Sequence, residues 1–220
     1  MIIGISGLIG SGKDTVANFL IEKGFVKGSF ADSLKDSVSA IFGWDRIMLQ
    51  GDTVESRDWR ETVDDWWSIK LGEPTTPRSV LQKFGTDVCR NHFHSDIWLL
   101  SLEKKILENE RNNVNTVISD VRFRNEIAMI QKLNGKTFNV KRGPEPPWWF
   151  EAVLAFEATT DDVREHHADK LRYHYNLHET EWDWVGHKFD TVIQNDGTLD
   201  DLKEKALNVL AKYEFFGKDI

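Results

Sequence analysis

The chain has little cysteine and no long apolar run, and each shortage excludes a class of protein. Cys89 is the single cysteine among 220 residues, which excludes an internal disulfide and favours a reducing compartment. No apolar run approaches the roughly 18 residues that a membrane helix needs, and the opening residues 1–3 lack the basic flank and apolar core of a secretory leader. We therefore expect a cytoplasmic protein that does not associate with membranes.

Positive charge is also in short supply. The sequence has 28 basic and 36 acidic residues, a formal net charge of -8, which opposes binding of a polyanion over a broad surface. Nucleic-acid polymers are therefore not expected partners, whereas small phosphates can still bind at local basic clusters. The length suits one α/β domain over residues 1–220, with at most a mobile insertion.

Short apolar strands alternate with amphipathic helices along most of the chain. Strands are expected at 2–6, 116–119, 138–140 and 191–194, and helices at 14–23, 32–42, 77–90, 96–110, 123–133 and after 197. This order predicts an α/β fold with a doubly wound parallel sheet, helices on both faces, and sites at the carboxyl ends of the strands.

Two segments depart from that alternation. Residues 43–77 are polar, rich in tryptophan and poorly periodic, so we expect an insertion that covers a site. Residues 143–186 open with three prolines and continue with histidines, charges and aromatic residues, which favours a mobile lid that contains some helix.

The stretch GLIGSGKDT, residues 7–15, follows the first strand and precedes an amphipathic helix. Its glycines permit a tight turn that aims backbone N–H groups at phosphate oxygens, and the helix adds the positive end of its dipole. Lys13 would contact the outer phosphates of a nucleoside triphosphate. The pattern predicts a phosphate loop, with ATP bound by Gly10, Ser11, Gly12, Lys13, Asp14 and Thr15.

Asp14 is unexpected in this loop, because a hydroxyl residue normally follows the lysine and binds Mg²⁺. A carboxylate beside a triphosphate is repelled unless a cation lies between them. We therefore expect Asp14 to hold Mg²⁺ through water, while Thr15 donates its hydroxyl to a phosphate. The alternative is that Asp14 only interacts with the helix N-terminus and faces solvent.

Six segments in a fixed order carry a resemblance that covers most of the chain. They are GLIGSGKDT, PRSVLQKFGTDVCRNHFHSDIW, VISDVRFRNE, VKRGP, HETE and IQNDGTLDDL. Together they resemble phage deoxynucleoside monophosphate kinases. The resemblance implies the nucleoside monophosphate kinase fold, transfer of the terminal phosphate of ATP to a deoxynucleoside monophosphate, use of Mg²⁺, a cytosolic location, and an association that is often dimeric.

The resemblance also implies a site for the acceptor nucleotide. Its residues would be Arg60, Arg78, Gln82, Gly85, Thr86, Trp98, Asp120, Arg122, Glu126 and Glu181. Their chemistry suits the task, since guanidinium groups bind phosphate, amides and hydroxyls hydrogen-bond, and an indole packs on a ring. Asp120, at the end of a buried strand, is assigned to acceptor binding and to orienting the attacking phosphate, which needs no base because it is already largely a dianion.

Further residues are placed by position. Arg142 follows a strand and opens the lid, so closure would bring it against the transferring phosphoryl group and exclude water. Asn195 and Asp196 follow the last strand, where related kinases hold the adenine of ATP, although Asn-Asp-Gly is also a good turn sequence. The catalytic set is thus Lys13, Asp120 and Arg142.

The chain departs from the resembled family in its phosphate loop, and two alternative functions remain open from the sequence. A member of the resembled family carries basic residues inside the phosphate loop where this chain has Ile9 and Gly10, so Arg60 and Arg78 would hold more of the acceptor phosphate. The alternatives are another small-molecule phosphate-loop kinase, similar to phosphomevalonate kinases, and an ATP-binding module without catalysis.

Overall fold

The computed structural model describes residues 1–213, and the chain packs there as two compact units. The first unit contains Met1–Gly28 and the chain from Ile106 onward, and the second contains Ser29–Lys105. Helix α7 (Ile97–Arg111) carries the chain from the second unit into the first. That the whole chain, residues 1–220, is a single domain stays a prediction, because a division into two compact units does not test it. Within the described residues, the helices are too short or too polar to cross a membrane.

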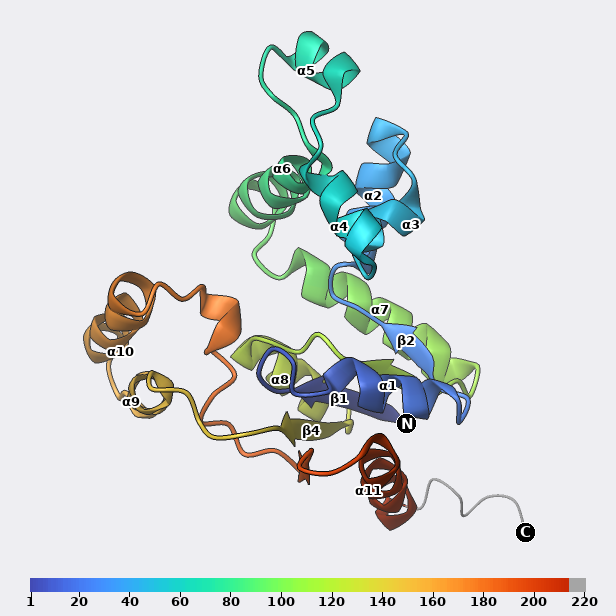
Figure 1. Ribbon diagram of the computed structural model, residues 1–220, viewed down its shortest axis with the longest axis vertical. Helices are drawn as coiled ribbons and strands as arrows, with labels where there is room; N and C mark the ends of the chain where they lie inside the picture. The colour runs from blue at the N-terminus through green and yellow to red at the C-terminus, as the bar shows by residue number, and fades with distance from the viewer. Residues whose placement is uncertain (214–220) are drawn as a thin grey trace. The chain divides into compact units, whose positions relative to one another are not determined.

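The first unit is built on a five-stranded parallel sheet in the order β2-β3-β1-β4-β5 (Figure 1). The strands are β1 (Ile2–Ser6), β2 (Val26–Gly28), β3 (Thr116–Ile118), β4 (Lys136–Lys141) and β5 (Thr191–Gln194). With β1 in the centre, the chain extends the sheet in both directions, which confirms the predicted doubly wound topology. β2 was not predicted from the sequence, because its three residues form no apolar run.

Helices cover both faces of this sheet, as predicted. α1 (Lys13–Ile21) and α11 (Leu199–Lys212) pack with the strands around a core that includes Ile3 and Ile5, which are fully buried. Burial of each such side chain contributes about 1.5–3 kcal/mol. α8 (Arg124–Lys132) packs on β1 and β4 from the opposite face (Figure 1). Gly4 leaves room there for the Ile130 side chain. The sheet is therefore held between helices, and its carboxyl edge carries the loops.

The segment expected as a lid, 143–186, folds into two helices and two short turns within the first unit. These are α9 (Trp149–Glu157), α10 (Asp161–Asp169), a π-helical stretch Lys170–His174 and a 3₁₀ turn Glu179–Glu181. The expected helical content is present, and the mobility of the segment stays a prediction.

Asp183 ties this segment to the start of α8. Its carboxylate, almost fully buried, accepts hydrogen bonds from the backbone N–H of Arg124 at 2.9 Å, from Arg124 Nε at 3.0 Å and from Arg164 at 2.7 Å. Two guanidinium groups thus offset the cost of burying one carboxylate. Asp183 is a long-range anchor between α8 and α10.

We expect Asp183→Ala to lower the free energy of unfolding by about 2–3 kcal/mol, because it leaves both arginines without their buried partner. This loss is smaller than the roughly 3–5 kcal/mol for a fully buried pair, since the arginine side chains are 35% and 28% exposed. Urea denaturation measures the change. Asp169→Ala, which removes an exposed pair with Arg172, is the matched control and should change stability by less than about 1 kcal/mol. Equal losses in both variants would contradict the anchor.

The second unit is helical. Its elements are α2 (Asp32–Phe42), α3 (Arg46–Gln50), α4 (Val54–Glu61), α5 (Asp65–Leu71), α6 (Pro77–Gln82) and a π-helical stretch Lys83–Arg90 that leads toward α7 (Figure 1). The irregular segment expected at 43–77 therefore contains three short helices. Asp45, Thr53 and Asp64 cap them by accepting backbone N–H groups, a local signal that poor periodicity obscured.

Tryptophans form much of the core of the second unit. Trp44 stacks on Phe42 at 4.6 Å and donates its indole N–H to Asp64 at 2.8 Å, while Trp67 donates to the Phe42 carbonyl at 3.1 Å. Trp66, in contrast, is 59% exposed. Trp67, for which the sequence offers no role, thus fixes α5 against the end of α2.

Candidate functional site

The loop between β1 and α1 has the backbone that a phosphate loop requires. Gly7 (φ 144°) and Gly12 (φ 105°) both occupy conformations that disfavour side chains. A Cβ on Gly7 would lie 2.3 Å from the Val140 carbonyl oxygen, and one on Gly12 would lie 2.7 Å from Asn195 Nδ2. Ser11 Oγ is buried and has no hydrogen-bond partner within residues 1–213, so it is free to donate to a phosphate oxygen. The residues therefore fit an anion held at the start of α1.

Lys13 is the first residue of α1 and lies against the loop. Its ammonium donates to the carbonyl oxygens of Gly7 and Leu8, both at 2.8 Å. Burial lowers the pKa of Lys13, and the Arg122 guanidinium lowers it further, whereas Asp14 and Glu181 act in the opposite direction. Lys13 thus belongs to a local cluster of two cations and two carboxylates.

Asp14 contacts the end of β3. Its Oδ1 accepts a hydrogen bond of 2.7 Å from the Ser119 hydroxyl, and Lys27 Nζ lies 4.0 Å from the same oxygen. Ser119 is buried, whereas the Asp14 side chain is 75% exposed. The alternative, that Asp14 only interacts with the helix N-terminus and faces solvent, is therefore incomplete, because one carboxylate oxygen has a defined buried partner. Ser119 was not among the predicted site residues, whereas its neighbour Asp120 was.

An open cleft of about 430 Å³ lies beside the loop. Its lining includes Gly10 and the run 12–15, together with Arg142 and Asn195. The structure thus brings together most of the residues assigned to ATP, Thr15 among them. Asn195 also donates its amide N–H to the Ser11 carbonyl at 2.8 Å, which joins the loop after β5 to the phosphate loop.

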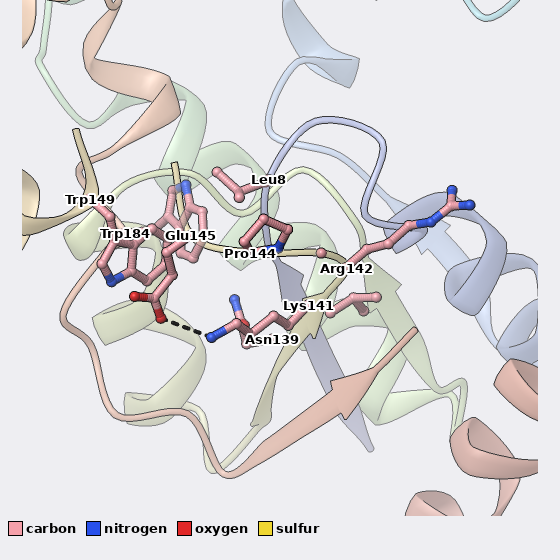
Figure 2. A pocket seen from close by; sticks show the side chains of 10 residues that line it. Leu8, Asn139, Lys141, Arg142, Pro144, Glu145, Trp149 and Trp184 are labelled. Atoms are coloured by element: carbon pink, nitrogen blue, oxygen red, sulfur yellow. Dashed lines mark hydrogen bonds and ion pairs between the residues drawn. The ribbon is translucent and has the colours of Figure 1, made fainter. Parts of the chain in front are cut away.

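Arg142 is part of the lining of this cleft. In Figure 2 its side chain points away from Trp149 and Trp184, while Lys141 pairs with Glu145 at 2.8 Å. Arg142 is exposed at the start of the segment expected to form a lid. Asp196 is not part of the cleft lining and pairs with Lys205 of α11, so its role toward adenine stays a prediction.

A second group of predicted residues follows β3 in the same unit. Arg122 pairs with Glu181 at 3.3 Å, and both influence Lys13, so the predicted Arg122 and Glu181 lie near the phosphate loop. Glu126 is buried and accepts the backbone N–H groups of Arg122 and Phe123 at 2.7 and 3.0 Å. Glu126 therefore caps α8, and any contact with an acceptor nucleotide stays a prediction. Asp120 is half-buried directly after Ser119.

The remaining acceptor residues belong to the second unit, where two arginines are neighbours. Burial lowers the pKa of Arg60, and the adjacent Arg78 guanidinium lowers it further. Arg60 lies against the backbone of Gly51, and its buried Nε has no hydrogen-bond partner in the described part of the chain. Arg78 pairs with the exposed Glu61 at 3.2 Å. Two close guanidinium groups with one carboxylate partner suit a phosphate.

Gln82 and Thr86 are exposed on and after α6, while Gly85 is buried in the π-helical stretch. Gly85 packs on Leu34, where a Cβ would lie 2.8 Å from a leucine methyl group. The Trp98 indole, 7% exposed, donates to the Gly85 carbonyl at 2.9 Å. Trp98 was expected to offer its ring to a base. Its indole N–H has a structural partner in its own unit, and contact of the ring with a base stays a prediction.

The parallel sheet and the loop after β1 define an α/β protein with a phosphate loop. A sequence model of the deoxynucleotide monophosphate kinase family matches residues 50–145. A protein of Acanthamoeba polyphaga mimivirus, described as a putative deoxynucleotide monophosphate kinase, is 34% identical over 157 residues, which are 64% of this chain and 74% of the relative. The deoxynucleoside-5'-monophosphate kinase of Escherichia phage T5 is 39% identical over 59 residues, 27% of this chain and 23% of that protein.

The chain belongs to the deoxynucleotide monophosphate kinase family, and it is a phosphotransferase. Among solved structures, TT1252 from Thermus thermophilus aligns with a TM-score of 0.47 at 22% identity, covering 97% of both chains. Dephospho-CoA kinase from Campylobacter jejuni aligns with a TM-score of 0.47 at 15% identity, covering 98% of both chains. The fold assignment rests on the strand order of the sheet itself.

Proposed function

We propose that the protein transfers the γ-phosphoryl group of ATP to a deoxynucleoside monophosphate, which yields ADP and a deoxynucleoside diphosphate. Family membership supports the reaction, and the single structural observation that carries it is the phosphate loop with Lys13 and Arg142 on one cleft. Positioning and charge neutralisation supply most of the catalysis of phosphoryl transfer. Four cationic side chains, Lys13, Arg142, Arg60 and Arg78, would provide them.

The donor ATP would lie along the cleft, with its phosphates on the loop residues 10–15 and its adenine near Asn195 and Asp196. Lys13 would exchange the carbonyl oxygens of Gly7 and Leu8 for phosphate oxygens. Mg²⁺ would accompany ATP and neutralise phosphate charge, and Asp14 would hold it through water. Arg142 would contact the transferring phosphoryl group when 143–186 closes.

The acceptor would bind through its phosphate to Arg60 and Arg78. In the first unit, Asp120, Arg122 and Glu181 are assigned to the acceptor by the family resemblance. Gln82, Gly85, Thr86, Trp98 and Glu126 are the further residues assigned to it. The cytoplasm is the expected location, and a homodimer is compatible with the family resemblance.

Production of ADP with ATP and Mg²⁺ tests the function. The acceptors are dTMP, dGMP, dCMP and dAMP, each beside its ribose counterpart. Turnover with at least one deoxynucleotide is expected, and a preference over the matched ribonucleotide would identify the sugar. ATP binding without turnover across the panel would overturn the proposal and favour either a non-nucleotide acceptor or a binding module.

A further inference from the structure

Ser119 and Asp14 form a pair that reverses the usual arrangement of a phosphate loop. In the usual arrangement a hydroxyl follows the loop lysine, and a carboxylate lies on another segment of the site, so that the two hold Mg²⁺ together. Here the carboxylate, Asp14, follows Lys13, and the hydroxyl, Ser119, comes directly after β3, the strand that pairs with β1. The two side chains nevertheless meet at 2.7 Å. The chemical pair is retained while its members are exchanged.

We propose that Ser119 is the positioning residue for the Mg²⁺ of bound ATP, and that it acts by orienting the Asp14 carboxylate. The inference rests on the proposed function only in assuming that ATP binds with Mg²⁺. Hydroxyl and carboxylate oxygens are the donors that Mg²⁺ accepts, usually with several waters retained, so the residues fit the ion. Asp14 also lines the cleft beside the loop, so its carboxylate is accessible from the side where the phosphates of ATP would lie.

The hydrogen bond between Ser119 and Asp14 is stronger than an ordinary contact between two exposed side chains. Ser119 is 5% exposed, and its hydroxyl donates to a carboxylate, a charge-assisted hydrogen bond that fixes one oxygen of Asp14. The competing contact is the Lys27 ammonium at 4.0 Å, an exposed pair that contributes little. Because one oxygen of the Asp14 carboxylate is already held, the side chain loses less conformational entropy when its other oxygen binds a hydrated cation. Outer-shell partners of this kind typically change metal affinity 10–100-fold.

The experiment measures the affinity for ATP with and without Mg²⁺ by titration calorimetry, so that the effect of the metal is separate from turnover. Ser119→Ala should reduce the strengthening of ATP binding by Mg²⁺ on the order of tenfold, with little change in metal-free ATP binding. Ser119→Thr retains a hydroxyl and should restore most of the effect. Ser6→Ala is the matched control, since Ser6 is a buried serine beside the loop whose hydroxyl donates to Val121 at 2.9 Å. It should leave the Mg²⁺ effect as in the wild type.

An exchange of the two residues gives the sharpest test. Asp14→Ser leaves two hydroxyls and no carboxylate, and Ser119→Asp places two carboxylates in contact, so each single variant should lose most of the Mg²⁺ effect. The double variant restores the usual order of hydroxyl and carboxylate and should recover more than either single variant. Urea unfolding of all variants separates loss of metal binding from loss of folding.

Three outcomes would overturn the inference. They are an unchanged Mg²⁺ effect in Ser119→Ala, a double variant no better than the better of the two single variants, and loss of the effect only in Asp120→Asn, which would move the metal to the next carboxylate. Failure of the proposed function is distinguishable. Suppose that no deoxynucleotide is phosphorylated, but that substitutions of Asp14 and Ser119 change Mg²⁺-dependent ATP binding as expected. The inference then stands, and the assignment of the acceptor fails.

Discussion

Lys13→Ala should lower kcat for phosphoryl transfer on the order of 10²–10³-fold. The ammonium is aimed by two carbonyl oxygens at 2.8 Å in a loop that excludes side chains at Gly7 and Gly12. Removal of one preorganised charge at the transferring group typically costs this much, because water does not replace it in the same geometry. Initial rates of ADP release at saturating ATP and acceptor measure the loss.

Lys23→Ala is the control for Lys13. Lys23 is an exposed lysine just beyond the end of α1, so the variant removes the same charge from the same region without touching the loop. It should keep kcat within about twofold of the wild type, as expected for a surface substitution. A Lys13→Ala enzyme with wild-type kcat would contradict the assignment of the loop to the transferred phosphate.

Arg60→Ala should lower kcat/KM for the acceptor on the order of tenfold to a hundredfold, mainly by raising its KM, while ATP affinity stays unchanged. Hydrogen bonds to charged groups are worth about 1.5–3 kcal/mol, which corresponds to that range. Arg60 suits the role because its half-buried guanidinium lies against Gly51 and beside Arg78, where a dianion would relieve the repulsion between the two cations. Steady-state rates with varied acceptor at saturating ATP give the value.

Arg57→Ala is the matched control on the same helix, α4. Arg57 is exposed and donates to the Asp52 carbonyl at 3.3 Å. Its loss should leave the acceptor KM near the wild-type value. Arg60→Lys should be intermediate, since an ammonium keeps the charge but not the planar fork that binds phosphate. Equal effects of Arg57→Ala and Arg60→Ala would indicate a general loss of charge and would contradict a specific clamp.

Several elements of the fold were predictable because their signals are local. β1 is a run of five buried residues followed at once by glycines, and α1 and α11 repeat apolar residues at the helical period. The three helices within 43–77 were missed for a related reason. They have five to eight residues each, too few to show a period, and they are stabilised by caps and by a tryptophan core.

The site residues also divide into those that the sequence could place and those whose contacts only the structure shows. Lys13, Arg142 and Asn195 could be chosen from position alone, since each follows a strand whose carboxyl end lies at one edge of a parallel sheet, and the three line one cleft. Glu126 and Trp98 carry the right chemistry for a nucleotide, yet they have structural partners that residue type did not reveal. These partners are contacts that only the packed chain reveals, and binding of the acceptor by Glu126 and Trp98 stays a prediction.

By itself, the sequence determined the phosphate loop, the parallel α/β class and the kinase family, because these depend on patterns within about ten residues and on their order. Only the tertiary structure decided which distant side chains meet. Asp14 and Ser119 are 105 positions apart, and Asp183 meets Arg124 across 59 positions. Such contacts follow from strand order and helix packing, which sum many small interactions over the whole chain. Asp14 stands where a hydroxyl residue normally binds Mg²⁺. No local pattern specifies that its carboxylate accepts a hydrogen bond from the hydroxyl of Ser119, at the end of β3.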